Sequence, residues 1–218
     1  MGNEKELLNV SKATIGRLPA YHRYLQEKLA AGEKTVSSTA IAEDLHLNAV
    51  QVRKDLSAIA REAGKPKLGF AVADLIADID RFLGYDNLND AVLVGVGGLG
   101  KALAGYVGFK NYGLNIVAAF DADPARVGTT VGGIKVFPAD ELARLVRRLN
   151  VLIGIVAVPK EAAQGVADEL IKGGVRAIWN FAPVHLNVPE NIAVKNEDMA
   201  ASLAILSKRL AEILNSEK

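Results

Sequence analysis

The chain has 218 residues, a formal net charge of +1 and no cysteine, so its length suits two domains. The total charge gives no global sign of nucleic-acid binding and leaves room for a local basic surface. The absence of cysteine excludes disulfides, iron–sulfur clusters, thiolate zinc sites and thiol redox switches, and the three histidines stand too far apart to suggest a metal site. Charge or glycine interrupts every long apolar run and the start, MGNEKELLNV, does not resemble a signal peptide, so we expect a soluble, cytoplasmic protein without a membrane segment.

The first expected elements are helices, one over residues 17–31 and two in the segment VSSTAIAEDLHLNAVQVRKDLSAIA, residues 36–60. The pattern of that segment indicates a helix, a tight turn and a second helix. Ser38 is expected to cap the first of these helices and Asn48 the second, because short polar side chains accept hydrogen bonds from the free amides at helix starts. The arrangement is typical of a helix-turn-helix unit.

The second helix of this segment has two different faces. Val52, Leu56 and Ile59 fall on one side of a helical wheel and form the expected core face. The other side carries residue types that read base edges and bind phosphates, although an ordinary solvated helix face would also be charged. The residues expected to contact DNA are Gln51, Arg53, Lys54 and Ser57 on this helix and Ser38 at the start of the helix before it.

The next segment, EAGKPKLGFAVADLI, places Lys65 and Lys67 among glycine and proline and resembles the β-hairpin wing of a winged helix. Between Asn48 and Phe70 there are five basic residues and two acidic ones. Such a stretch can provide the positive surface that phosphates need. Residues 1–85 are therefore expected to form a winged-helix DNA-binding domain.

A glycine-rich turn follows a short apolar strand that is expected over residues 90–96. The turn has the pattern Gly-x-Gly-x-x-Gly, formed by Gly95, Gly97 and Gly100. In dinucleotide-binding folds these glycines permit the turn, let the backbone approach a diphosphate and let the following helix pack closely on the strand. The next strand ends in Asp121, which can accept a hydrogen bond from a ribose 2′-hydroxyl and would repel a 2′-phosphate. The pattern favours NAD(H) over NADP(H), with nearby Arg126 as the one reservation.

Strands and helices alternate as far as residue 183. Strands are expected over 115–121, 131–137, 151–159 and 175–183, and helices over 139–150 and 160–174. The alternation predicts an α/β fold, a Rossmann-type doubly wound parallel sheet over residues 86–195. Ligands of such sheets lie beyond the carboxyl ends of the strands. The residues expected near the nicotinamide end of a dinucleotide are therefore Val158, Pro159, Phe181 and Pro183.

A dinucleotide fold commonly serves hydride transfer, but this sequence offers no convincing acid or base. Tyr106 and Lys110 have the Tyr-x-x-x-Lys spacing of short-chain dehydrogenases, yet we expect both in the helix directly after the glycine loop, away from the nicotinamide. His185 has no neighbouring arginine or aspartate to clamp a substrate. We therefore expect a cofactor sensor without catalytic residues. An NAD-dependent oxidoreductase with a small accessory domain is the alternative, and a DNA-architectural module with a degenerate cofactor pocket is a third.

The last expected element is a helix over residues 197–215. Its apolar residues recur at alternating steps of four and three, and further apolar residues widen the apolar surface. A terminal helix of this kind has to be buried between bodies. We expect residues 196–218 to form a dimerisation helix, domain-swapped between the two chains of a homodimer. Two-fold symmetry would then present two recognition helices to a palindromic site.

Segments in order along the whole chain carry a family resemblance: IGRLPAYHRYL, VSSTAIAEDL, QVRKDLS, VGVGGLGKAL, FDADPARVG, VPKEAAQ, NFAPVHLNVP and the helix after NED. Through them the chain resembles the Rex family of bacterial redox-sensing transcriptional repressors. The resemblance implies a cytoplasmic homodimer that binds palindromic operator DNA and is released by NADH, so that it responds to the NADH/NAD+ ratio.

The resemblance also implies roles for single residues. Arg17, Tyr106 and Asp198 would form a switch, in which the carboxylate from the partner subunit changes companions between two states. We hypothesise that the neutral dihydronicotinamide fits an apolar interface near Pro159, Phe181 and Met199, where the charged ring of NAD+ would require more desolvation. The residues expected to contact the dinucleotide are Gly95, Val96, Gly97, Gly98, Leu99, Gly100, Asp121, Val158, Pro159, Phe181, Pro183 and Met199.

Overall fold

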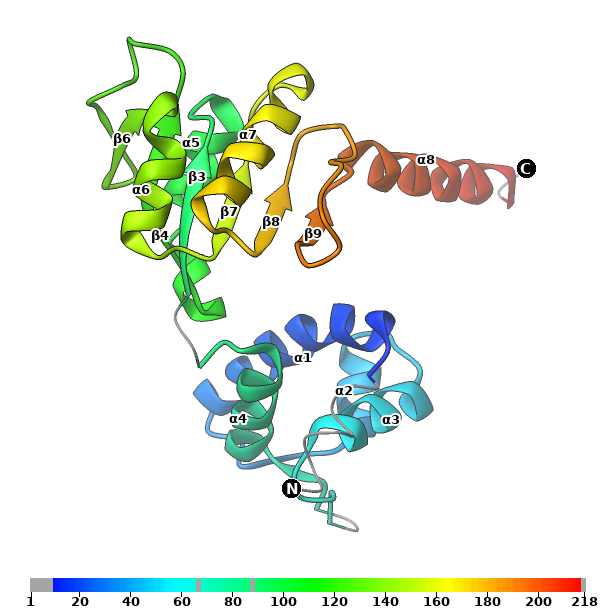
Figure 1. The fold of residues 1–218 in the computed structure, drawn as a ribbon. Helices are drawn as coiled ribbons and strands as arrows, with labels where there is room; N and C mark the ends of the chain where they lie inside the picture. Colours follow the sequence, from blue (N-terminus) through cyan, green and yellow to red (C-terminus); the bar gives the residue numbers. More distant parts are fainter. Residues whose placement is uncertain (1–9, 66–67, 87–88, 217–218) are drawn as a thin grey trace. The chain divides into compact units, whose positions relative to one another are not determined.

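The computed structural model describes residues 10–65, 68–86 and 89–216. The chain divides into two compact units, Met1–Asn87 and Leu88–Lys218. The first unit is mainly helical, and the second is built around a β-sheet (Figure 1).

The first unit contains the predicted helix-turn-helix and a small antiparallel sheet. Its elements are α1 (Lys12–Ala30), β1 (Thr35–Val36), α2 (Ser38–Asp44), α3 (Ala49–Ile59), β2 (Phe70–Ala71) and α4 (Val72–Leu83). Helix α1 begins at Lys12 and not at residue 17. The reason is a cap, since the hydroxyl of Ser11 accepts a hydrogen bond from the amide of Thr14.

Of the two predicted helix caps, the one at Ser38 is wrong and the one at Asn48 is confirmed. Ser37, and not Ser38, caps α2: Ser37 has an extended backbone and its hydroxyl accepts a hydrogen bond from the amide of Ala40, whereas Ser38 is already the first helical residue. The cap of α3 is confirmed. The Asn48 side chain accepts hydrogen bonds from two amides in the first turn of α3, at 2.9 and 3.1 Å.

One apolar cluster holds the first unit together. The predicted core face of α3 is confirmed, because Val52, Leu56 and Ile59 are all buried in this cluster. Burying an aliphatic side chain of this size stabilises the fold by about 1.5–3 kcal/mol. The orientation of α3 is thereby fixed, and its opposite face is left at the surface. The cluster also contains Leu18, Tyr21, Leu25, Ile41, Leu75 and Ile79.

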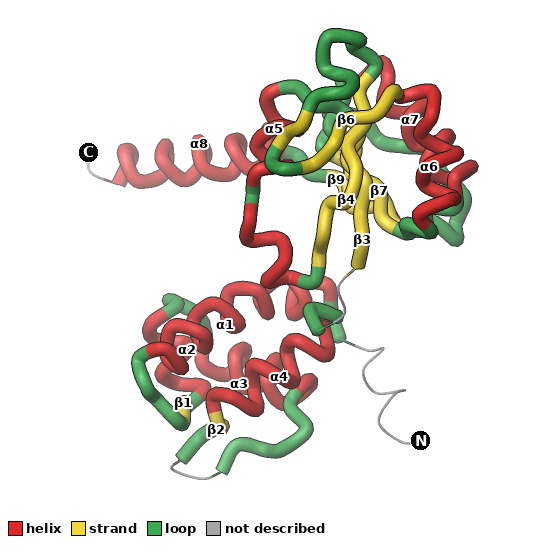
Figure 2. The backbone as a smooth tube through the Cα atoms, turned by 90° about the vertical axis from the view of Figure 1, so that its left-hand side faces the viewer, coloured by secondary structure: helices red, strands yellow, loops and turns green. Residues whose placement is uncertain are grey.

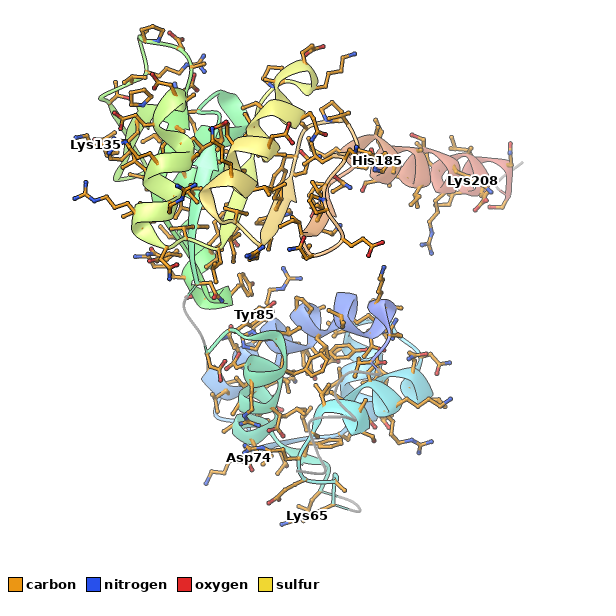
Figure 3. The ribbon with its side chains drawn as sticks, viewed as in Figure 1. Lys65, Asp74, Tyr85, Lys135, His185 and Lys208 are labelled. Carbon is orange, nitrogen blue, oxygen red and sulfur yellow. The ribbon has the colours of Figure 1, made fainter. Side chains whose placement is uncertain are left out.

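A tight hairpin follows α3 at the position of the expected wing. Lys65 and Gly69 pair in an antiparallel bridge, and β2 then pairs with β1. Gly69 has a φ of +76° and a side chain there would meet the carbonyl group of Val36, so the turn requires glycine. Lys65 lies at this turn (Figure 3), and Lys67 lies outside the described residues. Helix α4 follows β2 directly and is a helix that the sequence pattern did not lead us to expect.

The second unit contains, among its described residues, a seven-stranded sheet. Its strands are β3 (Asn89–Val94), β4 (Leu114–Asp121), β5 (Thr130–Val131), β6 (Ile134–Pro138), β7 (Ile153–Val156), β8 (Ala177–Asn180) and β9 (Ala193–Asn196). They lie in the order β5-β6-β4-β3-β7-β8-β9, and neighbours are parallel except β5 and β6. The chain runs outward from β3 on one side and then from β7 on the other. This confirms the doubly wound Rossmann-type sheet, whose switch point lies between β3 and β7.

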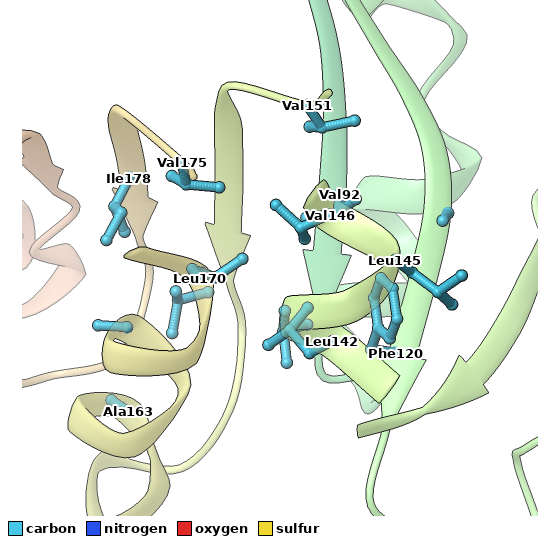
Figure 4. Close-up of a cluster of buried hydrophobic side chains, with 14 of the residues drawn as sticks. Val92, Phe120, Leu142, Leu145, Val146, Val151, Ala163, Leu170, Val175 and Ile178 are labelled. Atoms are coloured by element: carbon cyan, nitrogen blue, oxygen red, sulfur yellow. The ribbon is translucent and has the colours of Figure 1, made fainter. Parts of the chain in front are cut away.

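Helices cover both faces of this sheet (Figure 2). They are α5 (Gly98–Gly105), α6 (Leu142–Leu149) and α7 (Lys160–Gly173). Successive residues of β3 point to opposite faces, as the geometry of a strand requires. Val92 and Val94 lie in the cluster that α6 and α7 cover (Figure 4), whereas Ala91 and Leu93 lie in a second cluster with Ala104 of α5. The sheet is therefore a central layer between two apolar cores.

The two edges of the sheet differ from expectation. Residues 131–137 do not form one strand, because Gly132 and Gly133, with φ of +56° and +81°, turn the chain into the β5–β6 hairpin. Strand β9 was not expected. Its residues alternate between exposed and half-buried, so it lacks the continuous apolar run by which the inner strands could be recognised.

The last element is α8 (Met199–Ser216), close to the predicted bounds. All its described side chains are exposed in the single chain, including the apolar ones; Lys208 marks the helix in Figure 3. The exposed apolar residues of α8 are Met199, Leu203, Ile205, Leu206, Leu210, Ile213 and Leu214.

Within the described ranges, no helix combines the length and apolarity needed to cross a bilayer. In the same ranges, no three His, Asp or Glu side chains form a group that could hold a metal ion.

Candidate functional site

The glycine loop connects β3 to α5 at the switch point of the sheet. Gly95 has a φ of +95°, and a side chain there would meet the carbonyl group of Ala157; a side chain at Gly100 would meet the carbonyl oxygen of Gly95. Gly97 is different, because an added Cβ would have no described atom within 4 Å. Gly98 and Leu99 begin α5, whose first amides have no partner within the helix. Open space beside free amides at a helix N-terminus fits a diphosphate group.

Asp121 lies at the carboxyl end of β4, beside this loop. Its buried carboxylate accepts hydrogen bonds from the amide of Val96 at 2.7 Å, from the amide of Asp123 at 2.9 Å and from Arg126 Nη1 at 3.1 Å. Burial alone would raise the pKa of Asp121, but these hydrogen bonds outweigh it and hold the pKa below its usual value. A carboxylate has about four acceptor positions, so one remains for a further hydroxyl. Asp121 thus fixes the glycine loop and can still bind a ribose.

A cavity of about 350 Å³ lies between the glycine loop and the end of β7. The cavity brings five of the predicted cofactor residues together with Arg126, whose guanidinium is held by Asp121 and by Asp123. Val96, Gly98, Leu99 and Gly100 belong to the loop and the first turn behind it. The cavity lining includes Gly95, Gly97, Asp121, Val158 and Pro159.

The remaining predicted cofactor residues lie further along the same edge of the sheet or beyond it. Phe181 directly follows β8, and its amide donates to Val156 at the end of β7. Pro183 is exposed in the loop after β8, in which His185 is also exposed (Figure 3). Met199 is the first residue of α8 and is 69% exposed. The structure of the single chain therefore does not bring Phe181, Pro183 or Met199 into the cavity.

An aromatic row links the end of β8 to the end of α5. The ring of Phe181 contacts Trp179 at a centroid distance of 4.8 Å, Trp179 contacts Phe109 at 5.6 Å, and Phe109 contacts Tyr106 at 4.8 Å. The helix expected around Tyr106 and Lys110 is wrong, because α5 ends at Gly105 and a 3-10 helix covers Val107–Tyr112. Tyr106 lies at this junction and is half-exposed, so the spacing of a dehydrogenase helix is lost.

The surface of α3 presents the predicted DNA-contacting residues together. Gln51, Arg53, Lys54 and Ser57 are exposed on α3, whereas Ser38 is half-buried at the start of α2. Lys65 is exposed in the hairpin.

Two predicted switch residues are already engaged within their own units. Arg17 Nε and Nη2 donate to the carboxylate of Asp55 at 2.7 and 2.9 Å, and Asp198 accepts a hydrogen bond from the amide of Ala201 in the first turn of α8. Sequence reasoning missed Asp55. Its signal was an acidic residue on the otherwise apolar core face of α3, directly before Leu56.

Comparison with known families matches both units. A model described as a CoA binding domain matches residues 86–184, and one described as a putative DNA-binding protein N-terminus matches residues 9–57. The redox-sensing transcriptional repressor Rex of Porphyromonas gingivalis is 42% identical over 215 residues, covering 98% of each chain. That of Bacteroides fragilis is 41% identical over 206 residues, covering 94% of this chain and 93% of its own. The chain belongs to the Rex family of redox-sensing transcriptional repressors.

Solved Rex-family structures resemble the whole chain as well. RSP, a Rex-family repressor, matches with a TM-score of 0.85 at 35% identity over 95% of this chain and 97% of its own. RSP in complex with β-NAD+ and operator DNA matches with a TM-score of 0.87 at 35% identity over 95% of each chain, and RSP with β-NADH with 0.84 at 34% identity over 96% and 99%. The Rex resemblance drawn from the motifs is confirmed, and relatives named as repressors support a regulator and not an enzyme.

Proposed function

We propose that this Rex-family chain is a homodimeric repressor that binds palindromic operator DNA and releases it when NADH binds. The observation that carries the proposal is the combination, in one chain, of an exposed basic face on α3 with a glycine loop and cavity at the switch point of a Rossmann-type sheet. Solved complexes of the Rex-family repressor RSP with β-NAD+ and operator DNA, and with β-NADH, support the two ligands. Such a regulator would act in the bacterial cytoplasm, where the NADH/NAD+ ratio is set.

On the DNA side, α3 is the proposed recognition helix. Gln51 and Ser57 offer hydrogen-bonding side chains to base edges, and Arg53 and Lys54 offer charge to phosphates. Lys65 and Lys67 would add phosphate contacts from the wing, and Ser38 from the start of α2.

On the cofactor side, Gly97 and the amides of α5 would hold the diphosphate and Asp121 the adenosine ribose. The path toward the nicotinamide would be lined by Val158, Pro159 and Phe181. The protein would bind the nicotinamide as a signal and transfer no hydride to or from it. A 2′-phosphate would meet the buried negative charge of Asp121, which favours NAD(H).

The dimer is proposed to form through α8. An isolated helix with its apolar residues in water is unfavourable, because each apolar side chain loses the stabilisation that burial would give. Exchange of this helix between two chains would bury that face, bring Met199 and Asp198 of one chain to its partner, and link two recognition helices for a palindrome. The proposed switch consists of Arg17, Tyr106 and the partner subunit's Asp198.

The test is fluorescence anisotropy of a labelled palindromic operator duplex, titrated with the protein alone, with NAD+ and with NADH at one salt concentration. We expect tight binding that NADH alone abolishes. Lys54→Ala is the control for the DNA face: it should weaken operator binding and leave NADH binding unchanged. Operator binding that ignores both cofactors would refute NADH control, and absence of operator binding would refute the repressor.

A further inference from the structure

A buried carboxylate lies on the core side of α3. Asp55 is 2% exposed and accepts five hydrogen bonds. Two come from α1 hydroxyls, Thr14 Oγ1 at 3.0 Å and Tyr21 OH at 2.8 Å. Two come from Arg17, and the fifth comes from Nε2 of Gln51 at 2.8 Å, one turn earlier in α3. We call these residues the Asp55 cluster; its side-chain hydrogen bonds join α1 to α3 in addition to the apolar cluster that both helices share.

The Asp55 cluster holds a charge where a charge is costly. A buried carboxylate is tolerated only when it is paired and fully hydrogen-bonded, and Arg17 meets it through two nitrogens, the strong geometry for such a pair. Burial alone would raise the pKa of Asp55, but the donors of the cluster lower it below its usual value, so the group is ionised at neutral pH. Burial, together with the hydrogen bond to Asp55, raises the pKa of Tyr21 to about 12.

Gln51 connects this interior cluster to the surface. Gln51 belongs to the exposed face of α3 that we propose for DNA contacts, yet its amide nitrogen is bound to Asp55. A free glutamine side chain samples many rotamers, and fixing it in advance removes that entropy cost from binding. Its second amide hydrogen and its carbonyl oxygen remain for a base edge.

Arg17 is the outer member of the cluster. Its side chain is 26% exposed, and it uses Nε and Nη2 for Asp55. A guanidinium has five N–H donors, and among the described residues Nη1 of Arg17 makes no hydrogen bond. A second carboxylate can therefore bind Arg17 without first breaking its pair with Asp55.

We propose that Asp55 is a positioning residue for operator recognition: it presets Gln51 on α3 and couples that helix to whatever binds Arg17. This inference rests on the proposed function, since it assumes that α3 reads DNA. Asp55 then also has a role in the regulation. A ligand that moves the Arg17 guanidinium would change the hydrogen bonds of the Asp55 carboxylate, and this carboxylate holds both Gln51 and the junction of α1 with α3. Asp55 itself contacts no DNA.

The test is a double-mutant cycle in the full chain. Asp55→Asn keeps the shape but removes the charge, and we expect operator affinity to fall about tenfold, which corresponds to the loss of one charge-assisted hydrogen bond. In a Gln51→Ala background the same substitution should cost less than about threefold, because its effect passes through Gln51. NADH binding should be unchanged. A tenfold loss that persists without Gln51, or unchanged affinity of Asp55→Asn, would overturn the proposal.

Asp78→Asn is the matched control. Asp78 is another buried aspartate of the same unit, 5% exposed, and binds Arg61 and Arg81. Asp78→Asn should lower the melting temperature, and its effect on operator affinity should be the same with and without Gln51.

If Asp55→Asn does not fold, Thr14→Val is the second variant, because it removes one donor to Asp55 and should weaken operator binding in the same Gln51-dependent way. Losses of operator affinity that add up independently in Thr14→Val and Gln51→Ala would overturn the proposal. Failure of the wild type to bind operator would instead refute the proposed function.

Discussion

At the scale of the residue, space and charge decide what each position can do. Gly97 and Gly100 belong to one motif, but a side chain at Gly100 would meet backbone and one at Gly97 would enter open space. Asp55, Asp78 and Asp121 are all buried, and each is held ionised by several donors. Single substitutions can therefore separate ligand binding from folding.

Gly97→Ala should leave the fold intact and weaken NADH binding by about tenfold or more, because its methyl group takes the space we assign to the diphosphate. Isothermal titration calorimetry measures this. Gly165→Ala is the control, since Gly165 is an exposed residue of α7 with equal open space and is not one of the residues that line the cavity; it should bind NADH normally. Normal NADH binding by Gly97→Ala would remove the diphosphate from this loop.

Acid should destabilise the chain through its buried aspartates. Their pKa values are lowered in the folded state, so their stabilisation is complete above the ordinary Asp value of about 3.9 and is lost as the pH falls toward the folded-state values. For Asp78 burial opposes this shift, and the donors on Arg61 and Arg81 outweigh it. Urea unfolding should show a constant free energy near neutral pH and a decrease below about pH 4. Asp78→Asn should flatten this decrease; an unchanged slope would contradict the role of Asp78.

At the scale of the element, local hydrogen bonds set where helices begin and long-range packing sets their orientation. Helix α2 begins after Ser37 because that hydroxyl reaches the amide of Ala40. Helix α3 is oriented by Val52, Leu56 and Ile59 inside the apolar cluster and by Asp55 through its hydrogen bonds to α1. The exposed face of α3 is thus fixed from the inside.

The neighbouring serines Ser37 and Ser38 provide a direct test of the cap of α2. Ser37→Ala should destabilise the first unit by about 1 kcal/mol, the usual cost of removing an N-cap. Ser38→Ala should change stability by less than about 0.5 kcal/mol, because Ser38 is inside the helix, where alanine is the better helix former. Chemical unfolding of the two variants measures the difference. Equal losses would show that the hydroxyl of Ser37 is not the cap.

Sequence reasoning succeeded where the determinants are local. The glycine motif, the Asn48 cap and the apolar faces of α3 and the inner strands are short-range patterns, and each appears in the structure as expected. The Ser37 cap was missed because both serines satisfy the same preference. Strand β9 was missed because its alternating exposed and half-buried residues lack the apolar run of the inner strands. The Asp55 cluster was missed because its donors include residues of α1, far away in the chain.

At the scale of the whole molecule, the apolar side chains of α8 are exposed in the single chain. Nothing within the single chain buries the side chains of α8 that the structure describes. The dimer that we propose would explain this exposure, and it would also supply a second recognition helix for a palindrome.

Glutamate at both Leu206 and Leu210 should convert the dimer into a monomer, because charge cannot be buried in an apolar interface without a partner. Sedimentation velocity measures the mass. Operator affinity should fall by about a hundredfold or more, since two linked half-site contacts become independent. Lys208→Gln, on the same helix, should remain dimeric. A dimeric Leu206→Glu, Leu210→Glu variant would place the interface elsewhere.

Tyr106→Phe should uncouple NADH from DNA release. The ring contact with Phe109 is kept and only the hydroxyl is lost, so NADH should still bind. Loss of the hydrogen bond that we propose between this hydroxyl and the partner subunit's Asp198 should reduce the NADH-induced change in operator affinity by about tenfold. Operator titrations with and without NADH measure this ratio. A ratio equal to that of the wild type would reject a switch role for the Tyr106 hydroxyl.

Trp179 is the one tryptophan of the chain, and it lies in the second unit. Its indole nitrogen donates to Glu197 at 2.8 Å and its ring lies between Phe109 and Phe181. Selectively excited indole emission from the intact protein therefore reports the unfolding of the second unit alone, while circular dichroism reports the helices of both. Coincident transitions by the two probes would mean that the two units unfold as one cooperative system, and separate transitions would give each unit its own stability without a label.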